Sequence, residues 1–153
     1  DGLLYVDKTK QLLRLLDEGK YLFLSRPRRF GKSMLVTTLK ALFEGKKSLF
    51  EGLYLYDKWD WKEHPVIRLD FSVMVYSSSK KEFEADILSL LKTIALQYKV
   101  KVSGNHYKNY LRNLMIALHQ KMGRKVVVLI DEYDKPIDYS STTLPHGRLS
   151  LHF

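Results

Sequence analysis

The first hydrophobic segments of the chain predict a helix followed by a short strand. Four leucines recur on one helical face, at Leu12, Leu13, Leu15 and Leu16. Asp7 or Thr9 can cap the start of this helix, and Gly19 can end it. The apolar and aromatic run Tyr21–Leu24 then predicts a buried strand.

A second helix and a second strand follow the same logic. The helix is predicted to begin at Gly31 and to end near Gly45. Its inner face is formed by Leu35, Leu39 and Leu42. Residues 46–64 are predicted to form a loop or a partly helical stretch. Apolar and polar residues then alternate over Pro65–Ser72, which is typical of a strand.

Two further helices lead to a third strand. Ser79 and Glu82 have capping-box spacing at the start of one helix. Its apolar positions are Phe83, Ile87, Leu90, Leu91, Ile94 and Tyr98. Asn105 can cap the next helix, which Gly123 ends. The aliphatic run Val126–Ile130 is typical of a strand buried on both faces of a parallel sheet.

The order of these elements is typical of an α/β protein. Helical and extended segments alternate along the chain, which favours a mostly parallel sheet covered by helices. Crossovers between parallel strands are right-handed, and such sheets carry their ligand sites at the carboxyl ends of the strands. The residues that directly follow the predicted strands are therefore the candidates for chemistry.

The segment Ser25–Ser33, between the first strand and the second helix, carries part of a phosphate-binding loop. Its second half fits the pattern G-x-x-x-x-G-K-[ST]. Gly31 allows the tight turn that points backbone N–H groups at an anion, Lys32 can reach the β and γ phosphates of ATP, and the Ser33 hydroxyl can bind Mg²⁺. The candidate nucleotide-binding residues are Arg26, Pro27, Arg28, Arg29, Phe30, Gly31, Lys32 and Ser33.

This loop departs from the pattern at its start, because Arg26 stands where the first glycine belongs. A residue with a side chain disfavours a left-handed backbone, so the loop can open differently. Three arginines crowd the segment: Arg26, Arg28 and Arg29. They can contact phosphate or an acidic partner, or they can be solvated loop charges, and both interpretations stay open.

Two carboxylates follow the third strand. Asp131 is a candidate ligand of Mg²⁺, and Glu132 is a candidate catalytic residue that activates the attacking water. The alternative is an acidic turn that ends the strand, but the upstream GKS segment in the correct order favours the metal site. Asp70 ends the second strand and can face the same site, although a turn-forming role is the simpler interpretation.

Composition and charge narrow the partners of the chain. The 153 residues contain no cysteine, which excludes disulfides and thiolate chemistry, and no apolar stretch is long enough to span a membrane. We therefore expect a cytoplasmic protein. Residues 1–50 contain eleven Lys and Arg against five Asp and Glu, so most of the net charge of +9 lies around the phosphate loop. That excess suits a polyanion, either a nucleotide or a nucleic acid.

These motifs resemble the AAA-ATPase-like family, a divergent branch of the AAA-type P-loop ATPases. The resemblance is carried by YVDKT at Tyr5–Thr9, FLSRPRRFGKSMLVTTLKALFEG at Phe23–Gly45, HPVIRLDFS at His64–Ser72 and VVVLIDEYDKPI at Val126–Ile137. It implies a three-layer P-loop NTPase sandwich with a mostly parallel sheet. It also implies binding of ATP and Mg²⁺ followed by hydrolysis, and it implies that Asp7 and Lys8 lie near the nucleotide base.

The resemblance also sets the expected domain organisation. Residues 1–137 are expected to form the amino-terminal part of the ATPase-like domain. Residues 138–153 read DYSSTTLPHGRLSLHF and match none of the sensor, lid or arginine-finger elements of the family. We therefore expect a sheet that is incomplete at the carboxyl terminus, with hydrolysis in the complete protein.

The same resemblance leaves several partners open. A homo-oligomer stays open, and so does a nucleic acid bound through a nuclease-like domain elsewhere in the complete protein. The alternative function is a basic nucleic-acid-binding module with a vestigial or regulatory nucleotide site. A third alternative is a fragment that folds poorly.

Overall fold

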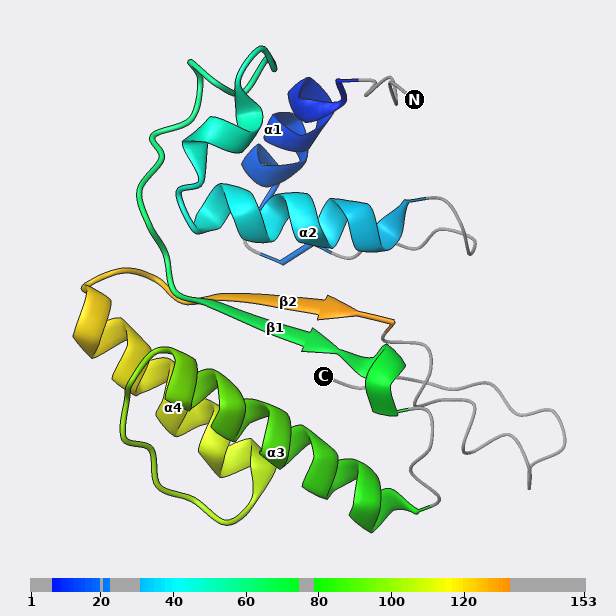
Figure 1. Cartoon of the computed structure of the whole chain (residues 1–153), viewed down its shortest axis with the longest axis vertical. Helices are drawn as coiled ribbons and strands as arrows, with labels where there is room; N and C mark the ends of the chain where they lie inside the picture. The colour runs from blue at the N-terminus through cyan, green and yellow to red at the C-terminus, as the bar shows by residue number, and fades with distance from the viewer. Residues whose placement is uncertain (1–6, 20, 23–30, 75–78, 133–153) are drawn as a thin grey trace, which may run out of the picture.

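The structure is a computed structural model that describes residues 7–19, 21–22, 31–74 and 79–132. The elements in chain order are α1 (Thr9–Asp17), α2 (Lys32–Phe43), the 3-10 helix η1 (Lys47–Phe50), β1 (Val66–Asp70), the 3-10 helix η2 (Phe71–Met74), α3 (Lys80–Gln97), α4 (Tyr107–Met122) and β2 (Val127–Asp131). Figure 1 shows the two strands between α1 and α2 on one side and α3 and α4 on the other. This arrangement confirms the predicted α/β class.

The two described strands pair in parallel. Val66 lies opposite Val127, and Asp70 lies opposite Asp131 at the other end of the pair. Parallel strands require a long crossover connection, which the pair of helices α3 and α4 provides here. The N–H of Val127 donates to the carbonyl of Pro65 at 2.9 Å, which adds a bond at the start of the pair.

The prediction that the last strand is buried on both faces is wrong. Leu129 and Asp131 are buried, but the alternating residues Val128 and Ile130 are 38% and 47% exposed. The reason is that the core beneath the sheet packs mainly against Ile67 and Leu69 of β1, so α3 and α4 leave part of β2 uncovered. The strand also begins and ends one residue later than predicted.

The larger core lies between the sheet and the helices α3 and α4. Its buried members are Ile67, Leu69, Ile87, Leu91, Ile94, Ala95, Tyr110, Leu114 and Leu118. The hydroxyl of Tyr98 accepts the N–H of Val66 at 2.8 Å, which fixes the end of α3 to the start of β1. Burial raises the pKa of Tyr98, so this hydroxyl stays protonated at neutral pH.

The ends of these two helices test the predicted capping residues. Ser79 caps α3 as predicted, because its hydroxyl accepts the N–H of Glu82 at 3.2 Å. The prediction that Asn105 caps α4 is wrong by one residue. His106 has the extended backbone of an N-cap, and its Nδ1 accepts the N–H of Lys108 at 3.3 Å.

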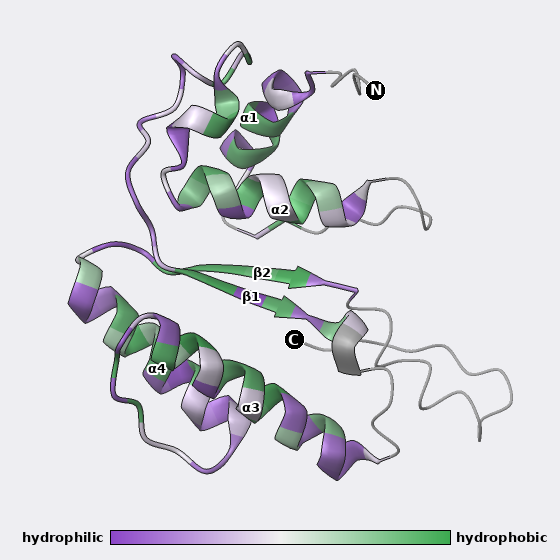
Figure 2. Cartoon of the chain, viewed as in Figure 1, coloured by the Kyte–Doolittle hydropathy of each residue, from purple (hydrophilic) through white to green (hydrophobic). Residues whose placement is uncertain are grey.

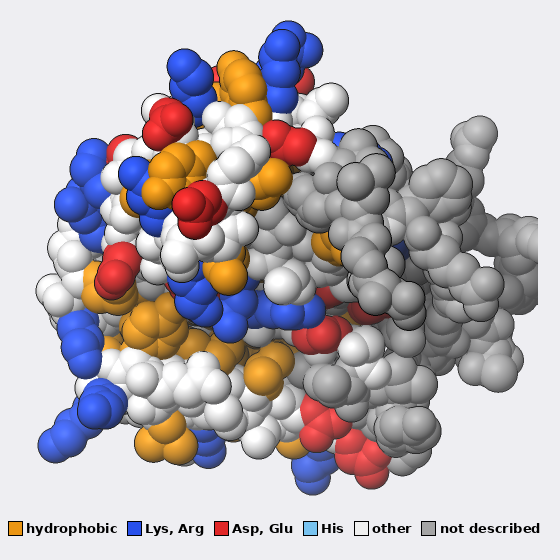
Figure 3. Space-filling view, turned by 45° about the horizontal axis from the view of Figure 1, so that its top comes forward, with side chains coloured by type: hydrophobic (Ala, Val, Ile, Leu, Met, Phe, Trp, Pro, Cys, Tyr) orange, Lys and Arg blue, Asp and Glu red, His pale blue; other side chains and the backbone are white. Residues whose placement is uncertain are grey.

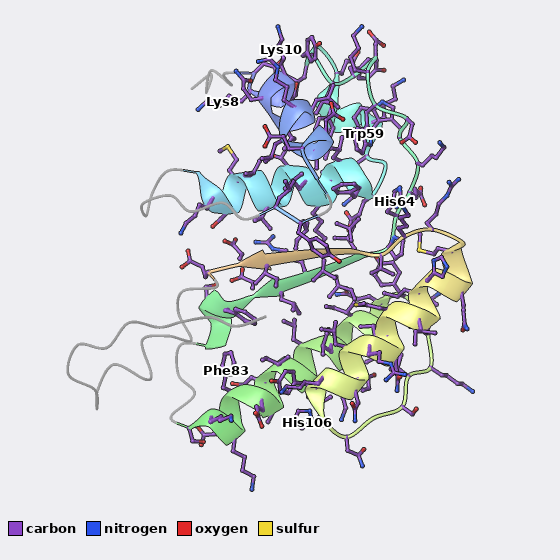
Figure 4. All side chains as sticks on the ribbon, turned by 180° about the vertical axis from the view of Figure 1, so that it is seen from behind. Lys8, Lys10, Trp59, His64, Phe83 and His106 are labelled. Atoms are coloured by element: carbon purple, nitrogen blue, oxygen red, sulfur yellow. The ribbon has the colours of Figure 1, made fainter. Side chains whose placement is uncertain are left out.

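A smaller core joins α1, α2 and the segment after them. Its buried members are Leu12, Leu42, Phe50 and Leu55. The side chain of Trp59 lies beside α2 (Figure 4), with its ring centroid 5.6 Å from that of Phe43. Trp61 donates its indole N–H to the carbonyl of Tyr56 at 2.8 Å. The segment 46–64, which includes η1, is therefore partly helical and packed, as its pattern predicts.

The predicted strand Tyr21–Leu24 is not found in its described half. Tyr21 is 97% exposed and Leu22 is 41% exposed, and neither belongs to a strand. A strand is buried by its neighbours, and no described strand pairs with these two residues. Residues 23 and 24 lie outside the described part of the chain.

The start of α1 is held by a side-chain clamp rather than by a simple cap. The N-cap position is Lys8, whose side chain makes no capping hydrogen bond. Of the two predicted capping residues, Thr9 is the first residue of the helix, and Asp7 does bind the first helical N–H as predicted. The Asp7 carboxylate accepts the N–H and the hydroxyl of Thr9, at 2.8 Å and 2.6 Å, and the N–H of Tyr54 at 2.8 Å. Thr9 is buried, and its hydroxyl oxygen accepts the N–H of Leu55.

This clamp gives the stability of the protein a dependence on pH. The hydrogen bond from the Thr9 hydroxyl, followed by those from Tyr54 and Thr9 N–H groups, holds the pKa of Asp7 below its ordinary value despite an opposing effect of burial. A carboxyl group whose pKa is lowered by folding stabilises the folded state at pH values above its pKa in the unfolded chain, which is about 3.9 for aspartate. That contribution is lost as the pH falls through the lower folded value.

We expect Asp7→Asn to lower the free energy of unfolding at pH 7, because the amide nitrogen cannot accept the N–H of Tyr54. The expected loss is only about 0.5 to 1 kcal/mol, because the site is exposed to solvent. Urea unfolding at pH 7 and at a pH near 3 measures the difference. The gap between variant and wild type should narrow in acid. Asp17→Asn, at the other end of α1, is the control, and an equal gap at both pH values would contradict the assignment.

Candidate functional site

The amino end of α2 begins at a glycine with a left-handed backbone. Gly31 precedes the helix with φ of 78°, in the left-handed region that favours glycine, and an added Cβ would meet no atom within 4 Å. The backbone conformation, and not a lack of space, therefore requires glycine here. Lys32 and Ser33 are the first two residues of the helix, and no described side chain caps it. The N–H groups of its first turn and the helix dipole thus favour negative charge.

The rest of the predicted phosphate loop lies outside the described residues. These positions are Arg26, Pro27, Arg28, Arg29 and Phe30. Their contacts with nucleotide stay predictions. The described part of the motif is Gly31, Lys32 and Ser33.

The carboxyl ends of the two strands lie at the same end of the sheet as the start of α2 (Figure 1). Both strands are hydrophobic along most of their length and become polar at that end (Figure 2). Asp70 and Asp131 are direct neighbours in the parallel register, so both side chains point to one face of the sheet. That face is the one covered by α2, because Arg68, two residues before Asp70, contacts Thr37 of α2. Asp131 is only 3% exposed.

Arg68 joins the two aspartates to the helix. Its Nη2 lies 3.4 Å from Oδ2 of Asp70 and 3.5 Å from Oδ2 of Asp131. Its Nη1 donates to the hydroxyl of Thr37 at 3.4 Å. The three contacts place a positive charge directly beside the predicted metal ligand.

Asp70 has two roles in the structure. One carboxylate oxygen accepts the N–H of Ser72 at 2.9 Å, which is the turn-forming role expected from its position. The other oxygen contacts Arg68, and the residue is the register partner of Asp131. The structure thus supports both interpretations of Asp70, since one side chain ends the strand and also faces the site.

Glu132 directly follows the buried aspartate and has an unusual backbone. Its φ is 54°, in the left-handed region that residues with side chains rarely adopt. Its N–H donates to Oδ1 of Asp131 at 3.0 Å, which compensates part of the cost of this conformation. Such conformations occur frequently at functional sites. The side chain is half-buried at the end of the strand.

The donor atoms at this site suit Mg²⁺. The Ser33 hydroxyl and the carboxylates of Asp70 and Asp131 are hard oxygen ligands. Within the described residues, no group of three or more His, Cys, Asp or Glu side chains could hold a metal by itself. A site with few protein ligands fits Mg²⁺, which binds through one or two carboxylates together with the phosphates of its substrate.

Among the residues that the structure describes, the remaining polar surface offers no second centre of this kind. The histidines His64 and His106 lie far apart (Figure 4), and His64 places its Nδ1 3.0 Å from the carbonyl of Lys125. Lys and Arg side chains are spread over the face drawn in Figure 3, with Asp and Glu among them. None of the described helices is both long and apolar enough to cross a membrane.

Arg68 and Thr37 are the site residues that sequence reasoning missed. The available signal was a charged residue in the middle of an apolar strand, two positions before Asp70 and therefore on the same face. Thr37 carried no comparable signal, because an exposed threonine on a helix is ordinary. Its contact with Arg68 depends on how α2 packs against the sheet.

Parallel strands between two layers of helices, with strand-end carboxylates beside the start of a helix, define an α/β protein with a candidate anion and metal site. A family model described as "Predicted AAA-ATPase" matches residues 1–147. The chain therefore belongs to the AAA-ATPase-like family. The match continues ten residues beyond Ile137, where we expected the family resemblance to end.

One curated relative adds length information. A protein of Azotobacter chroococcum mcd 1, described as "Uncharacterized protein in vnfD 5'region", is 41% identical over 138 residues. The alignment covers 90% of this chain and 27% of the relative. The chain therefore spans less than a third of the length of that relative. No solved structure matches the chain.

Proposed function

We propose that this chain is the ATP-binding part of a Mg²⁺-dependent ATPase, with hydrolysis carried out by the complete protein. Membership of the AAA-ATPase-like family supports nucleotide binding in general. The observation that carries the specific proposal is the meeting of two motifs. The start of α2, with Lys32 and Ser33, is capped by no described side chain and lies at the same end of the molecule as the buried Asp131 (Figure 1).

Each described residue has a distinct role in this proposal. The N–H groups at the start of α2 and the ammonium group of Lys32 bind the phosphates. Ser33 and Asp131 hold Mg²⁺, which neutralises charge on the β and γ phosphate oxygens when bound. Glu132 orients the attacking water and accepts its proton. Outside the described residues, Arg26, Arg28 and Arg29 add positive charge to the segment that precedes the helix in the sequence.

We expect Asp131→Asn to remove the dependence of ATP binding on Mg²⁺. An amide is a neutral and weaker ligand for Mg²⁺, so the ion no longer links the phosphates to β2. Calorimetric titration with ATP, with and without Mg²⁺, gives the measurement. Wild type should bind ATP at least about tenfold more tightly with Mg²⁺, a difference of about 1.4 kcal/mol.

The control for this variant is Asp57→Asn, an exposed aspartate with the same change of charge. It should retain the full effect of Mg²⁺. If Asp131→Asn also retained it, the metal role of Asp131 would be wrong. Binding of DNA that depends steeply on salt and ignores ATP would instead favour the basic nucleic-acid-binding alternative.

A further inference from the structure

Arg68 is a charged residue in the middle of an otherwise mainly apolar strand, a position where charge is unusual. It occupies the middle of β1, between Ile67 and Leu69, which are buried in the opposite face of the sheet. Its side chain is only 28% exposed, and Asp131 beside it is 3% exposed. A largely buried charge is costly unless partners compensate it, so the contact of its guanidinium group with the two strand-end aspartates is informative.

The guanidinium group lies one helical turn from the expected metal ligand on α2. Its contact there is Thr37, which follows Ser33 by four residues and therefore lies on the same helical face. On the strands it contacts both Asp70 and Asp131. Arg68 is thus a cation that lies between the helix and both strand-end carboxylates.

The polar contacts of the Arg68 guanidinium group are long for a group with a purely structural role. They measure 3.4 Å to Thr37, 3.4 Å to Asp70 and 3.5 Å to Asp131, against about 2.7 to 2.9 Å for strong charge-assisted hydrogen bonds. The buried Nε–H has no hydrogen-bond partner among the described residues. The positive charge is therefore shared among three oxygen atoms and not committed to one of them.

The positive charge of Arg68 affects how strongly the carboxylates of Asp70 and Asp131 attract a metal ion. Two neighbouring carboxylates without a cation would repel each other and would attract any divalent ion. Arg68 offsets one of the two negative charges, so a free divalent ion gains less from binding than it would without this cation. An ion carried by a nucleotide differs, because the phosphates supply most of its ligands and the positive end of α2 holds the phosphates.

We propose that Arg68 is a positioning residue that orients the Asp131 carboxylate and makes metal binding at Asp131 depend on nucleotide. The inference rests on the proposed function, because it assigns Asp131 to the metal of that site. It adds that the protein does not load the metal first. Before nucleotide binds, the guanidinium group of Arg68 supplies the positive charge beside Asp131 that the metal ion supplies once it binds together with the phosphates.

The test uses Mn²⁺ alone, without nucleotide, and follows bound ion by electron paramagnetic resonance. We expect wild type to bind Mn²⁺ weakly and Arg68→Met to bind it at least about tenfold more tightly, because removal of the cation exposes both carboxylates. Arg68→Lys keeps the charge and should stay close to wild type. The double variant Arg68→Met/Asp131→Asn should lose the gained affinity. Equal Mn²⁺ affinity in wild type and Arg68→Met would overturn the inference.

Two further measurements keep the test decisive. If Arg68→Met fails to fold, Arg68→Gln replaces it, and wild type alone remains informative. Tight Mn²⁺ binding by wild type without nucleotide, abolished by Asp131→Asn, would also overturn the inference. ATP titration of wild type is read separately. A wild-type protein that never binds ATP would contradict the proposed function, whereas the Mn²⁺ results concern Arg68 itself.

Discussion

Lys32→Ala is expected to reduce the affinity of the protein for ATP by at least about a hundredfold, the largest effect of any single substitution proposed for binding. Lys32 is the first residue of α2, and in the proposed site its ammonium group and the N–H groups of the first turn would act on the same anion. Alanine retains the helix, since it is the strongest helix former, but removes the charge. Titration with ATP in the presence of Mg²⁺ measures the loss.

The matched control for this prediction is Lys40→Ala on the same helix. Lys40 lies two turns further along α2, with its Nζ 3.5 Å from Oε1 of Glu44. Glu44 would still have an ion pair in this variant, because its Oε2 lies 2.7 Å from Nζ of Lys46. This variant should bind ATP like wild type. Thermal unfolding of both variants shows whether either substitution damages the fold. Unchanged ATP affinity in a folded Lys32→Ala protein would contradict the assignment of the phosphate site.

Glu132→Gln is expected to reduce ATP turnover by the complete protein by about 10² to 10⁴-fold, because glutamine cannot accept a proton from the attacking water. Affinity for ATP should change by less than about threefold, since Glu132 is assigned no phosphate or metal contact. The left-handed backbone at this residue is tolerated as well by glutamine as by glutamate. Steady-state turnover and equilibrium ATP binding, measured on the same preparation, separate the two effects.

The control for the catalytic assignment is Glu51→Gln, an exposed glutamate with the same change of charge. Its turnover should match that of wild type. Equal loss of turnover and of ATP affinity in Glu132→Gln would assign the residue to binding and would remove it as the catalytic base. Full turnover in Glu132→Gln would show that another group accepts the proton.

Much of the fold follows from local patterns in the sequence. Helical periodicity predicted α1, α2, α3 and α4, because each presents one apolar face over two or more turns. The run of aliphatic residues before Asp131 predicted a parallel strand, and the glycine before Lys32 predicted the start of α2. These features depend on residues that are close in sequence, so they can be read without knowledge of the packing.

Element ends were less predictable. Asn105 and His106 are both polar and adjacent, and only the backbone conformation selects His106 as the cap of α4. The burial of β2 was overestimated for a similar reason. A strand of aliphatic residues can be covered on one face or on two, and the choice depends on where the helices α3 and α4 pack.

By itself, the sequence determined the class of protein and the residues that carry its candidate chemistry: Gly31, Lys32, Ser33, Asp131 and Glu132. Tertiary structure alone decided that Asp70 lies beside Asp131 and that Arg68 reaches both of them and Thr37. The register of two parallel strands is set by contacts between segments far apart in the chain, and α2 meets them only after packing. For that reason the charge balance around Asp131 becomes visible only in the folded protein.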